Sequence, residues 1–296
     1  MKNTVFKGMA TAIVTPMKAD KSVDFDALGR LIDFQIESGI HALVAVGTTG
    51  ESATLEPWEQ KEVIRFTVQR VAGRVPVVAG TGTNNTLHVL EYVKNACEVG
   101  ADAILVVTPY YNKATQNGLI AHYTAVADLS TVPVILYNVP GRTGCNLLPQ
   151  TVAKLAEHPN IVGIKEAAGN MSQVVELMAL CGDKIDIYSG EDALNVPIMA
   201  MGGMGAISVL SNVIPGKASQ MAEAALAGDF QKAAALQCET LPLIKALFSE
   251  VNPIPAKAAV AAMGFGEENL RMPLTPMESA TRAKLYEEMR KQGIEV

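Results

Sequence analysis

The sequence predicts a closed (β/α)8 barrel, the TIM-barrel architecture of the α/β class, followed by a C-terminal helical extension. Three observations favour this fold. Apolar runs rich in β-branched residues recur about every 25–30 residues, and their near-continuous hydrophobicity is typical of parallel strands buried on both faces. Amphipathic stretches with helical spacing lie between these runs. After the eighth run only helical patterns remain.

Each predicted strand is one of these short apolar runs, and eight of them in one chain favour a closed barrel. The competing fold is an open, doubly wound sheet, which would carry a glycine-rich phosphate loop after its first strand. Here Thr11–Pro16 leads instead into Met17–Ser22. In chain order the predicted strands are Met9–Pro16, Ala42–Gly47, Pro76–Gly80, Ala103–Thr108, Pro133–Tyr137, Ile161–Lys165, Ile185–Ser189 and Gly205–Val209.

The stretch Asp26–Ser38 shows the pattern expected of the helices between the strands. Its apolar stripe contains Leu28, Leu31, Ile32 and Gln35, and its polar face mostly Asp26, Arg30, Asp33 and Glu37. Glycines stand where such helices should stop, because glycine adopts the left-handed conformation of a helix end without steric cost. These glycines are Gly39, Gly73, Gly100 and Gly228.

Past Val209 the pattern is purely helical. We therefore divide the chain into a barrel that carries the site, residues 1–225, and a helical extension packed on it, residues 226–296. The prolines of Asn252-Pro-Ile-Pro255 should break this helical region. The predicted helices are Pro215–Ala227, which is the last helix of the barrel, Asp229–Phe248, Ala256–Met263 and Pro276–Gln292.

The composition disfavours several classes of function. The 296 residues are 49% hydrophobic and carry a net charge of −6, which allows a large core and disfavours nucleic-acid binding. No apolar segment reaches the length of about 18 residues that crosses a membrane, and the N-terminus lacks the apolar run of a signal peptide. We expect a cytoplasmic protein with no nucleic-acid or membrane partner. The four cysteines and four histidines are scattered, so we also expect no metal site and no Ser–His–Asp triad.

One lysine lies inside an apolar run, in the stretch Ile161-Val-Gly-Ile-Lys-Glu-Ala167. Burial disfavours an ammonium ion, so the pKa of Lys165 should fall. The neutral amine is a nucleophile suited to forming an imine with a carbonyl substrate. The alternative is a lysine just past the strand end, solvated or paired with Glu166, and the stretch alone does not decide between the two.

Polar residues gather at the carboxyl ends of other strands, where barrels of this kind place their chemistry. Gly47-Thr-Thr-Gly-Glu51 could cradle a carboxylate with backbone amides and hydroxyls, or be only a strand-to-helix turn. Tyr137 could exchange protons close to the lysine, or be an ordinary barrel residue. Arg142 could grip a carboxylate with both arms of its guanidinium, or be a solvated loop arginine.

Four motifs stand in order along the chain: Gly47-Thr-Thr-Gly-Glu51, Pro109-Tyr-Tyr-Asn112, Tyr137-Asn-Val-Pro-Gly-Arg-Thr-Gly144 and Gly163-Ile-Lys-Glu166. Through them the whole chain resembles the dihydrodipicolinate synthase family of pyruvate-dependent class I aldolases. The lysine and Gly-x-Thr-Gly-Glu motifs are shared across that superfamily, including N-acetylneuraminate lyase and the sugar-acid aldolases. The narrower signal is Arg142, together with the Thr48–Thr49 pair and Tyr111.

This resemblance implies an activity and a set of residue roles. Lys165 would form an imine and then an enamine with pyruvate, which adds to L-aspartate 4-semialdehyde in the diaminopimelate and lysine pathway, with no cofactor. Tyr137, Thr48 and Tyr111 would relay protons, with Tyr111 reaching across the tight dimer interface of a homotetramer made of two dimers. The residues implied to bind substrates are Thr48, Thr49, Ile207 and Gly190 around pyruvate, and Arg142 for the semialdehyde carboxylate.

The resemblance also indicates a departure in regulation. Feedback-inhibited members bind lysine at the dimer interface, and they usually carry glutamate where this chain has His88 and histidine or tryptophan where it has Gln60. An ammonium ligand needs a carboxylate partner, which imidazole does not provide, so we expect weak or absent inhibition by lysine. The corresponding positions in this chain are Ser52, Ala53, Pro57, Gln60, Asn84, His88 and Tyr110.

Two other functions stay open from the sequence. A sister aldolase acting on N-acetylneuraminate or a 2-keto-3-deoxy sugar acid would share Lys165. Its polyhydroxylated substrate would need hydroxyl-binding groups rather than a second carboxylate clamp at Arg142. The other is a catalytically silent binding or regulatory protein. The presence of Lys165, Tyr137 and Tyr111 together argues against it.

Overall fold

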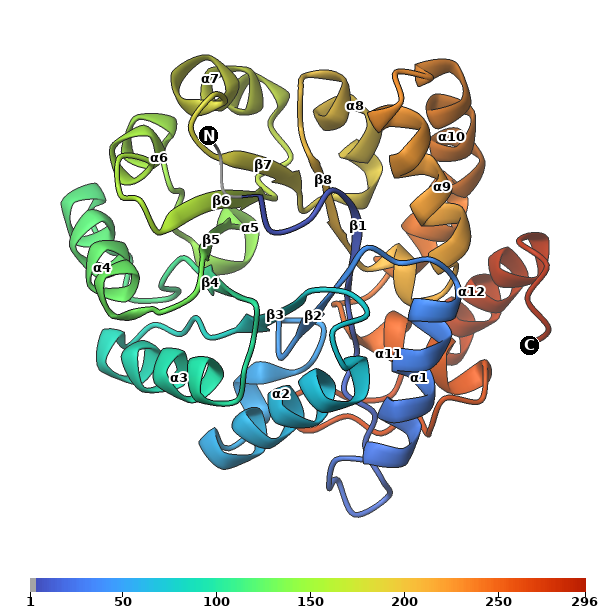
Figure 1. The fold of residues 1–296 in the computed structure, drawn as a ribbon. Helices are drawn as coiled ribbons and strands as arrows, with labels where there is room; N and C mark the ends of the chain where they lie inside the picture. Colours follow the sequence, from blue (N-terminus) through green and yellow to red (C-terminus); the bar gives the residue numbers. More distant parts are fainter. Residues whose placement is uncertain (1–3) are drawn as a thin grey trace.

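The computed structural model describes residues 4–296, and it confirms the closed eight-stranded barrel (Figure 1). Residues 1–3, which the sequence analysis assigned to the barrel, lie outside the described residues. The strands follow chain order around the barrel, all neighbours are parallel, and β1 pairs with β8 to close it. The strands are β1 (Gly8–Ala12), β2 (Ala42–Ala45), β3 (Val77–Gly80), β4 (Ala103–Val107), β5 (Val134–Asn138), β6 (Ile161–Glu166), β7 (Asp186–Ser189) and β8 (Gly205–Ser208).

Two strands end at least two residues earlier than predicted, for local reasons. The predicted strand Met9–Pro16 is too long: β1 ends at Ala12, and the amide of Val14 donates to the side-chain Oδ1 of Asn212 at 3.1 Å rather than to a neighbouring strand. The predicted strand Ala42–Gly47 is also too long. There β2 ends at Ala45 because Val46 has a φ of 57°, a left-handed conformation that breaks an extended chain.

Helices surround the barrel and cover the outer faces of its strands (Figure 1). The predicted stripe of the first helix is confirmed, since its four apolar-face residues are buried, and Asp24 caps the helix by accepting from the amide of Ala27. All four predicted stop glycines have positive φ. The helices of the barrel are α1 (Phe25–Glu37), α2 (Pro57–Val71), α3 (Thr86–Glu98), α4 (Gln116–Leu129), α5 (Pro140–Thr143), α6 (Pro149–Leu155), α7 (Met171–Cys181), α8 (Asn195–Ala200) and α9 (Pro215–Leu226), with short 3-10 turns η1 (Ser52–Thr54), η2 (Asp192–Leu194) and η3 (Leu210–Asn212).

Three further helices follow α9: α10 (Phe230–Leu247), α11 (Ile254–Ala262) and α12 (Ser279–Lys291). Helix α10 packs against α9 and α12, and α11 packs against α12 and η3. The break between α10 and α11 lies earlier than predicted, at Phe248–Pro253. Pro255 belongs to the first turn of α11, where the missing N–H of proline would have no intrahelical partner in any case.

The core has two layers. One lies between the strands and the helices, and the other fills the barrel interior with small side chains such as Ala10, Val78 and Ala103. The amino end of the barrel is closed by Phe6 and Tyr188, whose rings stack with centroids 4.4 Å apart while the Tyr188 hydroxyl donates to the Phe6 carbonyl oxygen. The cavity of the barrel therefore lies at the opposite end, where the strands have their carboxyl ends. No helix within residues 4–296 is long and apolar enough to cross a membrane.

Candidate active site

A cavity of about 230 Å³ lies at the carboxyl ends of the strands. Its walls come from the ends of β2, β5, β6 and β7, from Val209 after β8, and from Phe248 and Asn252 between α10 and α11. The fold therefore brings together residues that are up to about two hundred positions apart in the chain. The predicted site residues that line this cavity are Thr48, Thr49, Tyr137, Arg142, Lys165 and Gly190.

Lys165 is buried near the end of β6, with 6% of its surface exposed. The strand register sets it beside Tyr137 on β5, and its Nζ lies 4.5 Å from the centre of the tyrosine ring. Glu166 faces the other side of the strand. Its carboxylate accepts hydrogen bonds from Asn138 Nδ2 at 3.0 Å, Gln173 Nε2 at 3.1 Å and the Ala168 amide at 2.7 Å. Pairing of Lys165 with Glu166, the alternative interpretation, is therefore wrong.

Burial and, to a smaller extent, the cation of Arg142 lower the pKa of Lys165, while Asp192 and Glu191 oppose the shift, and the resulting pKa is about 8. About a tenth of this lysine is then uncharged at pH 7. A second buried lysine, Lys257, is 1% exposed, and its partners differ from those of Lys165. It forms a salt bridge with Glu51 and also donates to the Asn269 carbonyl oxygen at 2.8 Å. Among the described residues Lys165 has no such carboxylate partner, so it is the lysine prepared for nucleophilic attack.

Gly190 makes room for the lysine. A Cβ at this position would lie 2.9 Å from Cε of Lys165 and 2.8 Å from Cβ of Ala167, closer than real side chains approach. Its amide donates to the carbonyl oxygen of Glu166 at 2.8 Å, which ties the end of β7 to β6. Any larger residue here would press the lysine out of its position.

Tyr137 stands between the lysine and the loop after β2. Burial raises the pKa of its hydroxyl, while Arg142 and a hydrogen bond with Thr48 lower it. Thr108 holds the tyrosine backbone, because both its amide and its hydroxyl donate to the Tyr137 carbonyl oxygen. A protonated tyrosine in contact with a threonine hydroxyl can both give and receive a proton, as general acid–base chemistry requires.

The two threonines lie in a tight turn after β2. Gly50 N donates to the Gly47 carbonyl oxygen at 3.0 Å, and Glu51 N to the Thr48 carbonyl oxygen at 3.1 Å. The hydroxyl oxygen of Thr49 accepts from Asn252 Nδ2 at 3.0 Å, which leaves the Thr49 hydroxyl proton free to donate. Both threonines line the cavity, so this turn forms part of its wall.

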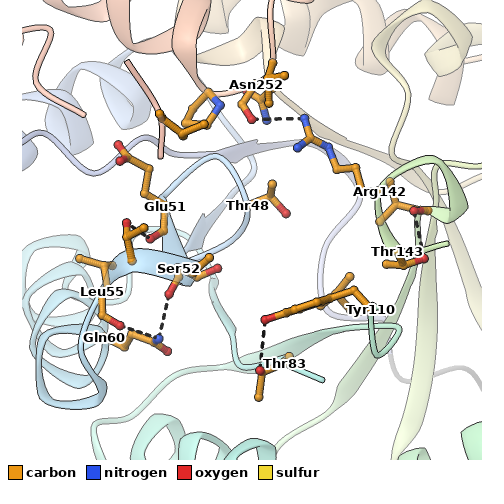
Figure 2. A pocket seen from close by; sticks show the side chains of 18 of the residues that line it. Thr48, Glu51, Ser52, Leu55, Gln60, Thr83, Tyr110, Arg142, Thr143 and Asn252 are labelled. Atoms are coloured by element: carbon orange, nitrogen blue, oxygen red, sulfur yellow. Dashed lines mark hydrogen bonds between the residues drawn. The ribbon is translucent and has the colours of Figure 1, made fainter. Parts of the chain in front are cut away.

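Arg142 lies in the short helix α5, and its Nη2 donates to the backbone oxygen of Asn252 at 3.2 Å (Figure 2). Arg142 lines the cavity, and it is also exposed to solvent. Asn252 contacts both Arg142 and Thr49, so it is a site residue that the sequence analysis missed. Its only signal was the Asn-Pro step, which indicated a helix break and said nothing about a contact with β2.

Two predicted residues do not join this cavity. Tyr111 is 88% exposed and does not line the cavity. Ile207 is 1% exposed inside the barrel, where β8 pairs with β1, and Val209 lines the cavity instead. The sequence pattern could not show which of Ile207 and Val209 lines the cavity, because both belong to the same apolar run.

A second, larger cavity of about 400 Å³ adjoins the first and shares Thr48, Val139, Arg142 and Asn252 with it. Of the predicted regulatory positions, Ser52, Ala53, Gln60 and Tyr110 line it, whereas Pro57, Asn84 and His88 do not. The Gln60 amide donates to the carbonyl oxygens of Ser52 and Leu55 at 3.0 and 3.2 Å (Figure 2). Its hydrogen-bond donors are therefore used within the chain. Residues 4–296 contain no group of three or more His, Cys, Asp or Glu side chains placed to hold a metal ion.

Comparisons with known proteins agree with this geometry. A model of the Dihydrodipicolinate synthetase family matches residues 5–292. The 4-hydroxy-tetrahydrodipicolinate synthase of Alkaliphilus oremlandii is 52% identical over 290 residues, which cover 98% of this chain and 100% of that protein.

Two solved structures give the same result. Dihydrodipicolinate synthase from Aquifex aeolicus superposes with a TM-score of 0.96 at 43% identity, covering 98% of this chain and 99% of that one. The enzyme from Acinetobacter baumannii, solved in complex with pyruvate, has a TM-score of 0.97 at 43% identity and covers 99% of this chain and 100% of that one. The fold, the lysine cavity and the sequence agree, and the chain belongs to the dihydrodipicolinate synthetase family.

Proposed function

We propose that this protein is a lyase that condenses pyruvate with L-aspartate 4-semialdehyde to give (2S,4S)-4-hydroxy-2,3,4,5-tetrahydrodipicolinate and water, in diaminopimelate and lysine biosynthesis. The observation that carries the proposal is Lys165, a buried lysine with no carboxylate partner within residues 4–296, which lines a cavity together with Arg142. Relatives that are about half identical over nearly the full length carry the matching name, 4-hydroxy-tetrahydrodipicolinate synthase.

In the first half of the reaction the neutral amine of Lys165 attacks the ketone carbon of pyruvate. A carbon–nitrogen bond forms, and the ketone oxygen is protonated through Tyr137 and Thr48 and leaves as water. The pyruvate carboxylate accepts from the hydroxyls of Thr48 and Thr49, with the backbone near Ile207 behind it. Loss of a methyl proton from the imine gives the enamine, which is a carbon nucleophile that needs no metal.

In the second half the enamine carbon attacks the aldehyde of the semialdehyde, whose carboxylate is held by Arg142. The new alkoxide takes a proton from the relay of Tyr137, Thr48 and Tyr111. The amino group of the adduct then attacks the imine carbon, the bond to Lys165 breaks, and the ring closes as the lysine regains its proton. The pyruvate carboxylate is thus matched by two hydroxyls and the semialdehyde carboxylate by one cation, while Lys165 reacts with the ketone.

The competing activity is cleavage of N-acetylneuraminate or a 2-keto-3-deoxy sugar acid on the same scaffold. A turnover assay with pyruvate and L-aspartate 4-semialdehyde, run beside cleavage of those two sugar acids, separates the activities. We expect rapid consumption of the semialdehyde and only trace cleavage of the sugar acids, because Arg142 provides a carboxylate clamp. Preferential cleavage of a sugar acid would keep the lysine chemistry and reject both this substrate and the role given to Arg142.

The rate should depend on pH through Lys165. Because its pKa is about 8, the reactive neutral fraction increases about tenfold per pH unit below that value and levels off above it. We therefore expect kcat/KM for pyruvate to rise with pH up to about 8 and then flatten. A profile that is level between about pH 6 and pH 9 would contradict the depressed pKa.

We propose a homotetramer built from two tight dimers, located in the cytoplasm, in which Tyr111 completes the site of the neighbouring subunit. The support is its position: a tyrosine 88% exposed, with a positive φ of 73°, beside the loop that carries Arg142. Four cysteines without disulfide bonds fit a reducing compartment.

This arrangement predicts complementation between two inactive variants. Lys165→Ala lacks the nucleophile, and Tyr111→Phe lacks the hydroxyl given to the neighbour. Refolding the two together in equal amounts should restore about a quarter of wild-type activity, since half of the dimers are mixed and each mixed dimer holds one complete site. Activity that stays at the level of the separate variants would show that Tyr111 does not act across an interface.

We further propose that lysine inhibits this protein weakly or not at all. His88 is exposed and lies outside the larger cavity, and the carboxylate of Glu51, which does line that cavity, is already paired with Lys257. Sub-millimolar lysine should leave the wild-type rate unchanged. His88→Glu should strengthen any inhibition about tenfold or more, as a charged hydrogen bond would. Strong inhibition of the wild-type protein by sub-millimolar lysine would overturn this proposal.

A further inference from the structure

The loop Val46–Glu51, which carries the two threonines, has left-handed backbone at both of its ends. Val46 has a φ of 57°, and Glu51 has a φ of 57° and a ψ of 38°. Left-handed conformations are unfavourable for residues with a Cβ, and most of all for a β-branched residue such as valine. Such a loop keeps its shape only when its surroundings hold it.

Contacts within the barrel hold only part of the loop. The Thr15 hydroxyl donates to the Gly50 carbonyl oxygen at 2.8 Å, and β3 lies so close that a Cβ on Gly80 would be 2.2 Å from the Val46 carbonyl oxygen. These contacts fix the start and the middle of the loop. They do not reach the side chain of Glu51.

The far end of the loop is held by the C-terminal segment, which is the part of the chain after α10, residues 248–296. Lys257 on α11 donates to the Glu51 carboxylate, and the two side chains are 2% and 1% exposed. The second carboxylate oxygen of Glu51 accepts from the Arg271 amide at 3.1 Å. Two residues before Glu51, the Thr49 hydroxyl is bonded to Asn252, which belongs to the same segment. The carboxylate and the threonine are thus both tied to one rigid neighbour (Figure 2 shows Glu51, Thr48 and Asn252 around the larger cavity).

We propose that Lys257 and Glu51 are positioning residues, whose buried ion pair holds the loop Val46–Glu51 so that the hydroxyls of Thr48 and Thr49 face Tyr137 and the pyruvate carboxylate. This rests on the proposed function. A buried ion pair gives little net stability over an apolar pair of the same size, but it demands one geometry. Lys257 lines neither cavity, so its effect reaches the reaction only through the loop.

The test is Lys257→Met, with Lys257→Arg as the conservative variant. We expect Lys257→Met to lower kcat/KM for pyruvate on the order of 10–100-fold, as a misplaced binding group does, and Lys257→Arg to recover part of the loss. The pH midpoint for trapping the pyruvate imine with borohydride should stay near 8, because β6 is untouched. A Lys257→Met protein with the wild-type kcat/KM would overturn the proposal.

A double variant separates positioning from stability. Lys257→Met combined with Glu51→Met leaves no buried charge, so folding should recover. The value of kcat/KM should stay low, because the loop has lost its tie; recovery to the wild-type value would reject the positioning role. Arg282→Met is the matched control, since it breaks an ion pair with Glu268 in the same segment without touching the loop, and it should leave kcat/KM unchanged.

These outcomes are distinguishable from failure of the proposed function. If the wild-type protein does not consume the semialdehyde, the proposed substrate is wrong. The pyruvate concentration needed for borohydride trapping still compares Lys257→Met with wild type in that case, because trapping does not use the second substrate. A higher concentration in the variant supports the positioning role, and an equal one rejects it.

Discussion

The ammonium group of Lys165 is buried at the end of β6, where the described part of the chain offers it no carboxylate partner, and the rest of the site is arranged around that constraint. Its pKa falls from 10.5 to about 8, so below pH 8 the charged lysine costs about 3 kcal/mol of folding stability, a cost that disappears as the pH rises from 8 to 10.5. The neighbouring carboxylate of Glu166 is occupied by amide donors on the other face of the strand. Burial also lowers the pKa of Lys257, but the carboxylate of Glu51 opposes that shift and forms a salt bridge with its ammonium group.

The packing of the rest of the fold offsets the loss of folding stability caused by burying Lys165. Closure of the barrel between β1 and β8, and the Phe6–Tyr188 stack at its amino end, leave the polar groups at the carboxyl end. The C-terminal segment also contributes directly to the site. Through Asn252 it contacts Thr49 on one side of the cavity and Arg142 on the other, so the regions given to the two substrates share one support.

Much of this fold follows from local pattern, because strands buried on both faces and helices that stop at glycine leave clear signals in the sequence. Lys165 was also visible as a charge in an apolar run, and the strand-end motifs carried the family resemblance. The left-handed turn at Val46 was hidden, since nothing local forbids a longer strand there. Asn252 and Lys257 were hidden for another reason: they contact residues 203 and 206 positions away, and a lysine in a helical pattern does not reveal a partner at such a distance.

The most direct test of the central claim is to find which lysine pyruvate modifies. The protein is incubated with pyruvate, reduced with borohydride, digested and mapped by mass spectrometry. The account predicts a single stable adduct on the peptide that contains Lys165, with the equally buried Lys257 unmodified. An adduct on Lys257, or no adduct under conditions in which the enzyme turns over, would contradict the claim that the unpaired buried lysine is the nucleophile.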